Sequence, residues 1–137
     1  MIRTLIDSGP LVAFYDRKDQ WHHWTHEQMD ALTPPLLTTE PVLTEACFLL
    51  QRGTGHPAVI LRAVQRGILQ IVFDAETEAA ALETLMERYA NVPMSLADAS
   101  LVRLSELHRE ARVFTLDRDF RQYRRHGRQV ISLLAPW

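Results

Sequence analysis

Short apolar runs alternate with helix-like segments along this chain, and this alternation constrains the fold more than any other feature of the sequence. The strand-like runs cover residues 2–6, 36–39, 68–73, 113–116 and 130–134. The helix-like segments begin at residue 8 and then cover residues 21–32, 41–52, 57–66, 76–89, 95–110 and 119–126. Strands separated by helices are typical of a mostly parallel sheet that is covered on both faces. We therefore predict a three-layer α/β/α fold for a single domain, residues 1–137.

Proline and glycine residues punctuate the predicted helices. Pro10 falls in the first turn of the helix that begins at Ser8, where proline is tolerated. Pro34–Pro35 ends the predicted helix at residues 21–32. Gly53, Gly67 and Gly127 each follow a helical pattern and are interpreted as helix ends. Internal repeats and low-complexity linkers are absent from the sequence.

The composition excludes several classes of protein. The chain is 47% hydrophobic and 23% charged, which is typical of a globular domain. No apolar stretch approaches the roughly 20 residues that span a bilayer, and the first residues do not resemble a signal peptide. The single cysteine, Cys47, cannot form an intramolecular disulfide, and we interpret it as a core residue in a reducing compartment. We therefore expect a cytoplasmic protein without a membrane partner.

Four acids in distant parts of the sequence are expected to meet at one edge of the sheet. Asp7 and Asp117 each follow a predicted strand, and Glu45 and Asp98 lie in the first turns of predicted helices. Ligands of open parallel sheets bind outside the carboxyl ends of the strands, where these positions converge.

Each acid also has a structural alternative. Asp117 can cap the helix that follows it, and Asp98 stands three residues after Ser95, as in a capping box. Asp7 can form a turn with the next two residues. Glu45 is harder to explain in this way, because it lies on a largely apolar helix face with no base three or four residues away. A carboxylate in that position needs a positive partner from elsewhere.

Clustered carboxylates repel one another, and either protonation or a bound cation relieves this repulsion. Oxygen donors without a converging cysteine or histidine favour Mg²⁺ or Mn²⁺ over zinc or copper. Such an ion polarises water and binds phosphate oxygens, so the cluster indicates metal-assisted hydrolysis of a phosphodiester.

Four segments that contain these acids resemble a known family. LIDSGPLVAFYD, VLTEACFLL, PMSLADASLV and VFTLDRDF closely resemble the four acidic motifs of the PIN-domain family, in particular of VapC-type toxins from bacterial toxin–antitoxin pairs. The likeness runs from Leu5 to beyond Phe120. The order and spacing of the four motifs together carry it, since no single motif is specific.

The resemblance implies a metal-dependent endoribonuclease on an α/β/α fold, whose products carry 5′-phosphate and 3′-hydroxyl groups. It also implies an antitoxin partner and a homodimer. Mg²⁺ or Mn²⁺ would be held, and catalysis performed, by the four acids Asp7, Glu45, Asp98 and Asp117. Auxiliary roles fall to Asp119 beside the fourth acid, to Thr115 as a hydroxyl donor, and to Ser8 as a donor to water or phosphate.

Two further segments admit a functional and a structural interpretation. Five arginines lie between Arg118 and Arg128, and of these Arg118, Arg121, Arg124 and Arg125 are candidate RNA-phosphate contacts. The alternative is a solvated helix face, and the spacing of Phe120 and Tyr123, three residues apart, predicts that these two side chains pack inward. In the segment WHHWTHE, His22 and His26 have a spacing used for zinc, but a third ligand is not evident. An amphipathic helix that packs Trp21 and Trp24 is the alternative, and the role of its histidines, His23 included, stays open.

The sequence argues against some other functions and leaves two alternatives to the ribonuclease hypothesis open. The Asp-x-Asp of haloacid-dehalogenase phosphatases is absent after the first strand, and the single lysine, Lys18, does not suit a phosphorelay receiver. A DNA or structure-specific nuclease of the same fold stays open, because acids alone do not distinguish RNA from DNA. A non-enzymatic interaction module whose acids bind a partner's arginine is the third alternative.

Overall fold

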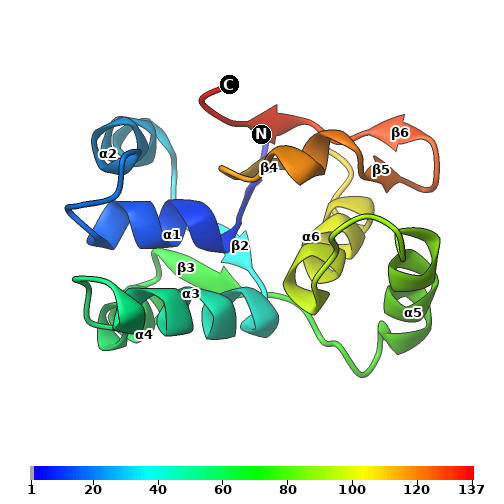
Figure 1. The fold of residues 1–137 in the computed structure, drawn as a ribbon, viewed down its shortest axis with the longest axis horizontal. Helices are drawn as coiled ribbons and strands as arrows, with labels where there is room; N and C mark the ends of the chain where they lie inside the picture. The colour runs from blue at the N-terminus through cyan, green and yellow to red at the C-terminus, as the bar shows by residue number, and fades with distance from the viewer. Residues whose placement is uncertain (1) are drawn as a thin grey trace.

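Five short strands form a parallel sheet in the order β3-β2-β1-β4-β7 (Figure 1). The computed structural model of the chain describes residues 2–137. The strands are β1 Thr4–Ile6, β2 Leu36–Thr38, β3 Leu69–Ile71, β4 Arg112–Phe114 and β7 Leu133–Leu134. Each connection from one strand to a parallel neighbour must cross over the sheet, so helices cover its faces.

Helices fill the connections between these strands. They are α1 Ser8–Tyr15, α2 His22–Ala31, α3 Glu40–Arg52, α4 Ala58–Gln65, α5 Ala79–Arg88 and α6 Leu96–Leu107. Helix α1 packs on α2 and α3, and α6 packs on α3 and α5. This arrangement confirms the predicted α/β/α fold with a central parallel sheet. Among residues 2–137, none of these helices combines the length and apolar character needed to cross a membrane.

The central strand β1 and its neighbour β4 carry fully buried residues just before the acidic motifs. Leu5 and Ile6 of β1 and Val113 and Phe114 of β4 are each 0% exposed. Ile6 pairs with Phe114 in the parallel register, so the residues that follow these strands emerge together at one edge. The backbone N–H of Asp7 continues the ladder by donating to the carbonyl oxygen of Phe114 over 3.0 Å. Burial of the strands therefore fixes where the first and fourth acidic motifs lie.

The helix predicted at residues 119–126 is wrong beyond its first turn. A short 3₁₀ helix, η1 Arg118–Arg121, is followed by an antiparallel hairpin of β5 Arg124–Arg125 and β6 Gln129–Val130. His126 has a φ of 51° and Gly127 has a φ of 78°. The two central residues of a type I′ turn both require such positive values. Gly127 is thus a turn residue rather than a helix end, and the predicted last strand is divided between β6 and β7.

Candidate active site

Asp7 lies at the carboxyl end of β1 and caps helix α1. Its Oδ1 accepts a hydrogen bond from the backbone N–H of Ser8 over 2.7 Å, and its Oδ2 accepts one from the Thr115 hydroxyl over 2.7 Å. The side chain is almost fully buried, with 3% of Asp7 exposed. Burial, reinforced by the charges of Asp98 and Glu45, raises the pKa of Asp7 to about 7, although the two hydrogen bonds oppose this shift.

Thr115 connects the first and fourth acidic motifs. While its hydroxyl donates to Asp7, its Oγ1 accepts from the backbone N–H of Asp117 over 3.0 Å. Asp117 in turn caps η1, because its Oδ1 accepts from the backbone N–H of Asp119 over 2.9 Å. The capping alternative for Asp117 therefore holds and is compatible with a place at the sheet edge. Burial, and then the charge of Asp117, raises the pKa of Asp119.

Glu45 reaches the same edge from the second turn of α3. Its Oε1 accepts a hydrogen bond from the Ser8 hydroxyl over 2.5 Å, so the hydroxyl after the first acid is directed at the second acid. Thr39 caps α3, and its Oγ1 lies 2.8 Å from the Ser100 Oγ on α6, with both side chains fully buried. This buried contact holds the beginning of α3, which carries Glu45, against α6, which carries Asp98.

Asp98 completes a capping box at the start of α6. Its Oδ2 accepts from the backbone N–H of Ser95 over 3.0 Å, and the Ser95 hydroxyl accepts from the backbone N–H of Asp98 over 3.0 Å. The fully buried Tyr123 also directs its hydroxyl at that Oδ2, 3.4 Å away, and at the carbonyl oxygen of Pro93. Burial, and then the charges of Asp117 and Glu45, raise the pKa of Asp98.

The structure thus brings the four predicted acids into one electrostatic neighbourhood. The charges of Asp98 and Glu45 raise the pKa of Asp7, and those of Asp117 and Glu45 raise the pKa of Asp98, which links the four acids electrostatically. Among residues 2–137, neither these four acids nor Asp119 forms an ion pair with a lysine, arginine or histidine. Carboxylates that raise one another's pKa, without a protein cation to offset them, favour the binding of a cation or a proton.

The donor set fits a hard divalent cation in its chemistry. The side chains that meet at this edge offer carboxylate and hydroxyl oxygens, which Mg²⁺ and Mn²⁺ prefer. Within the described part of the chain, however, no group of three or more acidic, histidine or cysteine side chains is already arranged to hold a metal ion. Several of their oxygens instead accept hydrogen bonds from Ser8, Thr115 and Ser95. The acids therefore influence one another electrostatically, but their oxygens are not arranged in advance as a shell of metal ligands.

A groove with a volume of about 760 Å³ opens beside Glu45, between the start of α3 and the start of α6. Its apolar lining includes Phe48, Phe73 and Leu96, and Phe48 is 56% exposed. Its acidic lining consists of Glu40, Glu45, Asp74 and Glu76. Such a groove suits a segment that carries both apolar and positively charged side chains.

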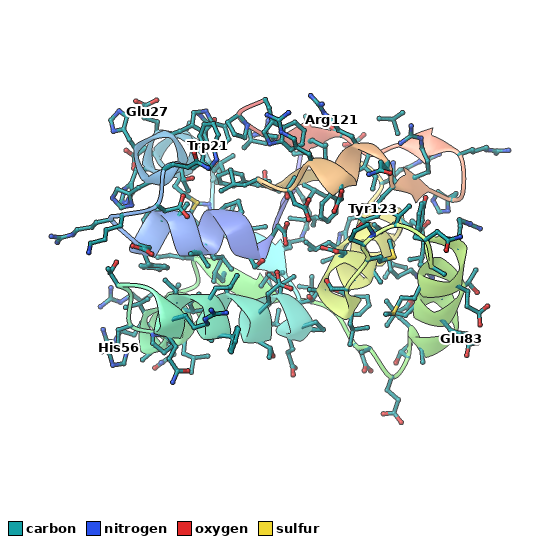
Figure 2. The ribbon with its side chains drawn as sticks, viewed as in Figure 1. Trp21, Glu27, His56, Glu83, Arg121 and Tyr123 are labelled. Carbon is teal, nitrogen blue, oxygen red and sulfur yellow. The ribbon has the colours of Figure 1, made fainter. Side chains whose placement is uncertain are left out.

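The candidate RNA-binding arginines fall into two pairs. Arg124 donates to the carbonyl oxygens of Arg121 and Tyr123, over 2.7 and 3.0 Å, and Arg125 donates to that of Ser105 over 3.0 Å. These two guanidinium groups therefore help to fix the hairpin. Arg118 and Arg121 are exposed, and the view with side chains shows Arg121 at the outer rim, whereas Tyr123 lies between η1 and α6 (Figure 2).

In the part of the chain that the structure describes, the histidines of α2 do not form a metal site. His22 Nδ1 lies 2.7 Å from the carbonyl oxygen of Ala13, and His26 Nε2 lies 3.0 Å from that of Phe14. These are carbonyl groups of the last turn of α1, which would otherwise lack helical donors. His26 also stacks on Phe14, with 4.1 Å between ring centroids. The two imidazoles thus dock α2 on the end of α1.

Two residues at the site were not predicted from the sequence. Tyr123 was interpreted only as a core residue, but its hydroxyl faces Asp98. Trp137 donates from its indole Nε1 to the carbonyl oxygen of Leu116, which precedes Asp117. Neither partner can be found from spacing, because hairpin β5–β6 and strand β7 determine which residues return to the sheet edge.

Comparisons with known proteins agree with this fold. The family model of the PIN domain matches residues 4–126. The chain is 25% identical over 116 residues to Ribonuclease VapC26 of Mycobacterium tuberculosis, covering 83% of this chain and 86% of that protein. Its fold is similar to the crystal structure of M. tuberculosis VapC20, a sarcin–ricin loop cleaving toxin. That match has a TM-score of 0.70 and 21% identity, and covers 83% of this chain and 89% of the other.

Proposed function

Because this chain belongs to the PIN domain family, we propose that it is a metal-dependent endoribonuclease that acts as the toxin of a type II toxin–antitoxin pair. The observation that carries this proposal is the group of carboxylates at the carboxyl edge of the sheet, which lacks a protein cation within residues 2–137. Similarity to a ribonuclease over most of both chains supports the choice of RNA as the substrate.

The four acids share the binding of the metal in the proposed reaction, and one of them accepts a proton. Asp7, Glu45, Asp98 and Asp117 would hold Mg²⁺ or Mn²⁺, which when bound would increase the acidity of water and offset charge on the phosphate. Asp98 or Asp117 accepts a proton from the attacking water. A bond forms between the water oxygen and phosphorus, the bond from phosphorus to O3′ breaks, and O3′ takes up a proton. The products carry a 5′-phosphate and a 3′-hydroxyl.

The hydroxyl and amide donors at the site orient these acids. Thr115 holds Asp7, and Ser95 holds one oxygen of Asp98, so the other oxygen, Oδ1, can take part in the reaction. The Ser8 hydroxyl is directed at Glu45 and can donate to a phosphate oxygen once Glu45 binds a cation. Because water attacks rather than the ribose 2′-hydroxyl, selectivity for RNA must arise in binding.

The decisive experiment maps cleavage sites in total cellular RNA after incubation with the purified chain. We expect discrete new 5′-phosphate ends in Mn²⁺ or Mg²⁺, none in excess chelator, and none with the Asp7→Ala variant. Glu83→Ala, which removes an exposed acid of α5 outside the site, is the matched control and should cleave as the wild type does. Ends that persist in chelator or with Asp7→Ala would contradict the proposal.

Cleavage assays with the same purified chain distinguish the ribonuclease from two alternatives, a DNA-directed nuclease and a non-enzymatic interaction module. A DNA-directed nuclease would cut deoxyribo-oligonucleotides at least as fast as ribo-oligonucleotides of the same sequence. An interaction module would cut neither, and Asp98→Asn would then change partner binding without any activity to lose.

The acidic and apolar groove supports an antitoxin as the partner. A peptide with apolar residues would cover Phe48 and Phe73, and its arginines would pair with the carboxylates of the groove and reach Glu45. We expect Phe48→Arg to weaken binding of the protein encoded by a short neighbouring reading frame at least about tenfold, from lost apolar contact and charge complementarity. Leu107→Arg, at an exposed apolar residue outside the groove, is the control and should bind normally.

A homodimer and a cytoplasmic location complete the proposal. Light scattering during size-exclusion chromatography of the purified chain, with and without its antitoxin, measures the oligomeric state. A mass that stays at 15.8 kDa across the micromolar range would contradict the dimer.

A further inference from the structure

Trp137 lies against the loop that carries the fourth acidic motif. Its indole Nε1 donates to the carbonyl oxygen of Leu116 over 3.3 Å, and the next residue is Asp117. The Leu116 side chain also approaches the start of α1, since a Cβ atom on Gly9 would lie only 3.2 Å from it. The indole is therefore fixed beside the edge of the sheet at which the acids meet.

Two arginines of η1 stand over this indole. The guanidinium carbon of Arg121 lies 4.6 Å from the ring centroid of Trp137, and that of Arg118 lies 5.6 Å from it. Within residues 2–137, neither guanidinium group donates a hydrogen bond to a protein acceptor or pairs with an acid, although Asp117 and Asp119 are close in sequence. Their N–H groups are therefore available to a ligand.

This pair differs from the other two candidate arginines. Arg124 and Arg125 are half-buried and donate to backbone carbonyl groups, whereas Arg118 and Arg121 are exposed. If the indole served only to anchor the segment after β7, its bond to Leu116 would be sufficient. That role does not explain why Arg118 and Arg121, which have no acidic partner in the described part of the chain, both lie over the same ring beside the acids.

We propose that Trp137, Arg118 and Arg121 form a binding subsite for one unpaired nucleotide of the RNA, adjacent to the acids. The inference rests on the proposed ribonuclease function. The base stacks on the layer formed by the indole and the guanidinium planes, since aromatic and guanidinium faces both accept unpaired bases. The neighbouring phosphate accepts hydrogen bonds from the arginines, which positions the strand toward the acids.

The test measures binding of a fluorescent ten-nucleotide single-stranded RNA in chelator, where cleavage is suppressed. We expect Trp137→Leu to raise Kd roughly 5- to 100-fold, the range for loss of one stacked base, and Trp137→Phe to restore much of the affinity. Arg121→Gln should lower the slope of log Kd against log salt by about 0.7, the effect of one lost phosphate contact on a single strand. Arg128→Gln, an exposed arginine of the hairpin turn, is the charge-matched control and should change Kd less than either variant.

Substitution of one nucleotide at a time by an abasic residue separates stacking from a general effect on the fold. The wild type should lose affinity most at one position, and Trp137→Leu should be insensitive to the abasic residue at that position. In Mn²⁺, Trp137→Leu should raise KM and leave kcat within about threefold, as expected when a contact contributes equally to substrate and transition state.

Three results would overturn the subsite. In the first, Trp137→Leu binds RNA as tightly as the wild type. In the second, it lowers kcat with unchanged Kd, which would make the indole only an anchor for the Asp117 loop. In either case the ribonuclease function stands if the wild type still cleaves RNA. In the third, the wild type neither binds nor cleaves RNA, and the proposed function fails together with the subsite.

Discussion

Asp7 is the most deeply buried of the acids at the sheet edge, and its environment makes stability depend on pH. Its pKa is raised from 3.8 to about 7, chiefly by burial, so the folded chain retains a proton that the unfolded chain releases. Between these two values the folded state binds more protons, and the free energy of unfolding must therefore fall as pH rises. The pKa difference corresponds to on the order of 4 kcal/mol at its upper limit.

We expect the metal-free chain to be more stable at pH 5 than at pH 7.5, and Asp7→Asn to lose most of this difference. Urea unfolding in chelator at the two pH values measures the effect. The raised pKa of Asp98 acts with the same sign, so a smaller slope should persist in Asp7→Asn. Equal slopes in the two proteins would show that Asp7 is not the titrating group.

Tyr123 couples the core to Asp98 through one hydroxyl. The ring is fully buried against Phe120 and Tyr89, with centroids 5.1 and 5.2 Å away, and the hydroxyl donates to Pro93 and faces Asp98. Tyr123→Phe keeps the ring but leaves these acceptors without their donor, which should lower the free energy of unfolding by about 1–2 kcal/mol.

Denaturant unfolding of Tyr123→Phe measures this cost. The control is Tyr15→Phe, which removes a hydroxyl from a tyrosine of α1 that is only half-buried. Its free energy of unfolding should stay within about 0.5 kcal/mol of the wild-type value. If the two substitutions cost the same, the Tyr123 hydroxyl has no special role in holding the start of α6.

At the scale of elements, hairpin β5–β6 replaces a predicted helix and packs on α6 (Figure 1). Arg125 donates to the carbonyl oxygen of Ser105, and the backbone N–H of His126 donates to Glu106 over 2.6 Å. These contacts depend on the type I′ turn at His126 and Gly127, since that turn places the β5 strand against the helix.

We expect Gly127→Ala to destabilise the chain by about 1 kcal/mol or more, because alanine is strained at a positive φ, and Gly127 has a φ of 78°. His126→Asn should be neutral or stabilising, since asparagine tolerates positive φ at the first central position of a type I′ turn. Thermal unfolding of both variants measures the contrast. Similar losses in the two would indicate that the turn conformation does not control the stability of the hairpin.

The same hairpin shows where prediction from the sequence ends. Phe120 and Tyr123 at a spacing of three residues were expected to pack inward, and they do, with 1% and 0% exposure. This spacing fits one 3₁₀ turn as well as an α-helix, so it predicted the burial but not the element. The glycine at position 127 was equally ambiguous, because a left-handed residue ends helices and also forms hairpin turns.

The sheet and the acids were predictable for a different reason. Buried parallel strands leave an apolar signature, and their register sends the residues after β1 and β4 to one edge regardless of the loops. Hydrogen-bond partners such as Ser8 on Glu45 or Trp137 on Leu116 depend on side-chain placement across 37 and 21 residues, which no local pattern encodes.

At the scale of the whole molecule, a net charge of −2 conceals an uneven distribution. In residues 2–137, the acids at the sheet edge and those that line the groove form no ion pair with a base, while Arg118 and Arg121 lie over Trp137 beside the sheet edge. Repulsion among the acids is a cost that the folded chain bears without a metal, and a specific cation should relieve it.

Divalent cations should therefore stabilise the chain at pH 7.5 more than monovalent salt of the same ionic strength. A ligand that binds only the folded state adds about 2.7 kcal/mol at one hundred times its Kd, so the melting temperature should rise with Mg²⁺ or Mn²⁺ as their sites fill. Asp98→Asn removes one charge from the cluster, and it should be more stable than the wild type in chelator but respond less to Mg²⁺. Differential scanning fluorimetry with NaCl controls separates ion binding from screening. If Mg²⁺ and matched NaCl raise the melting temperature equally, the carboxylates form no specific cation site and the metal-dependent mechanism loses its physical basis.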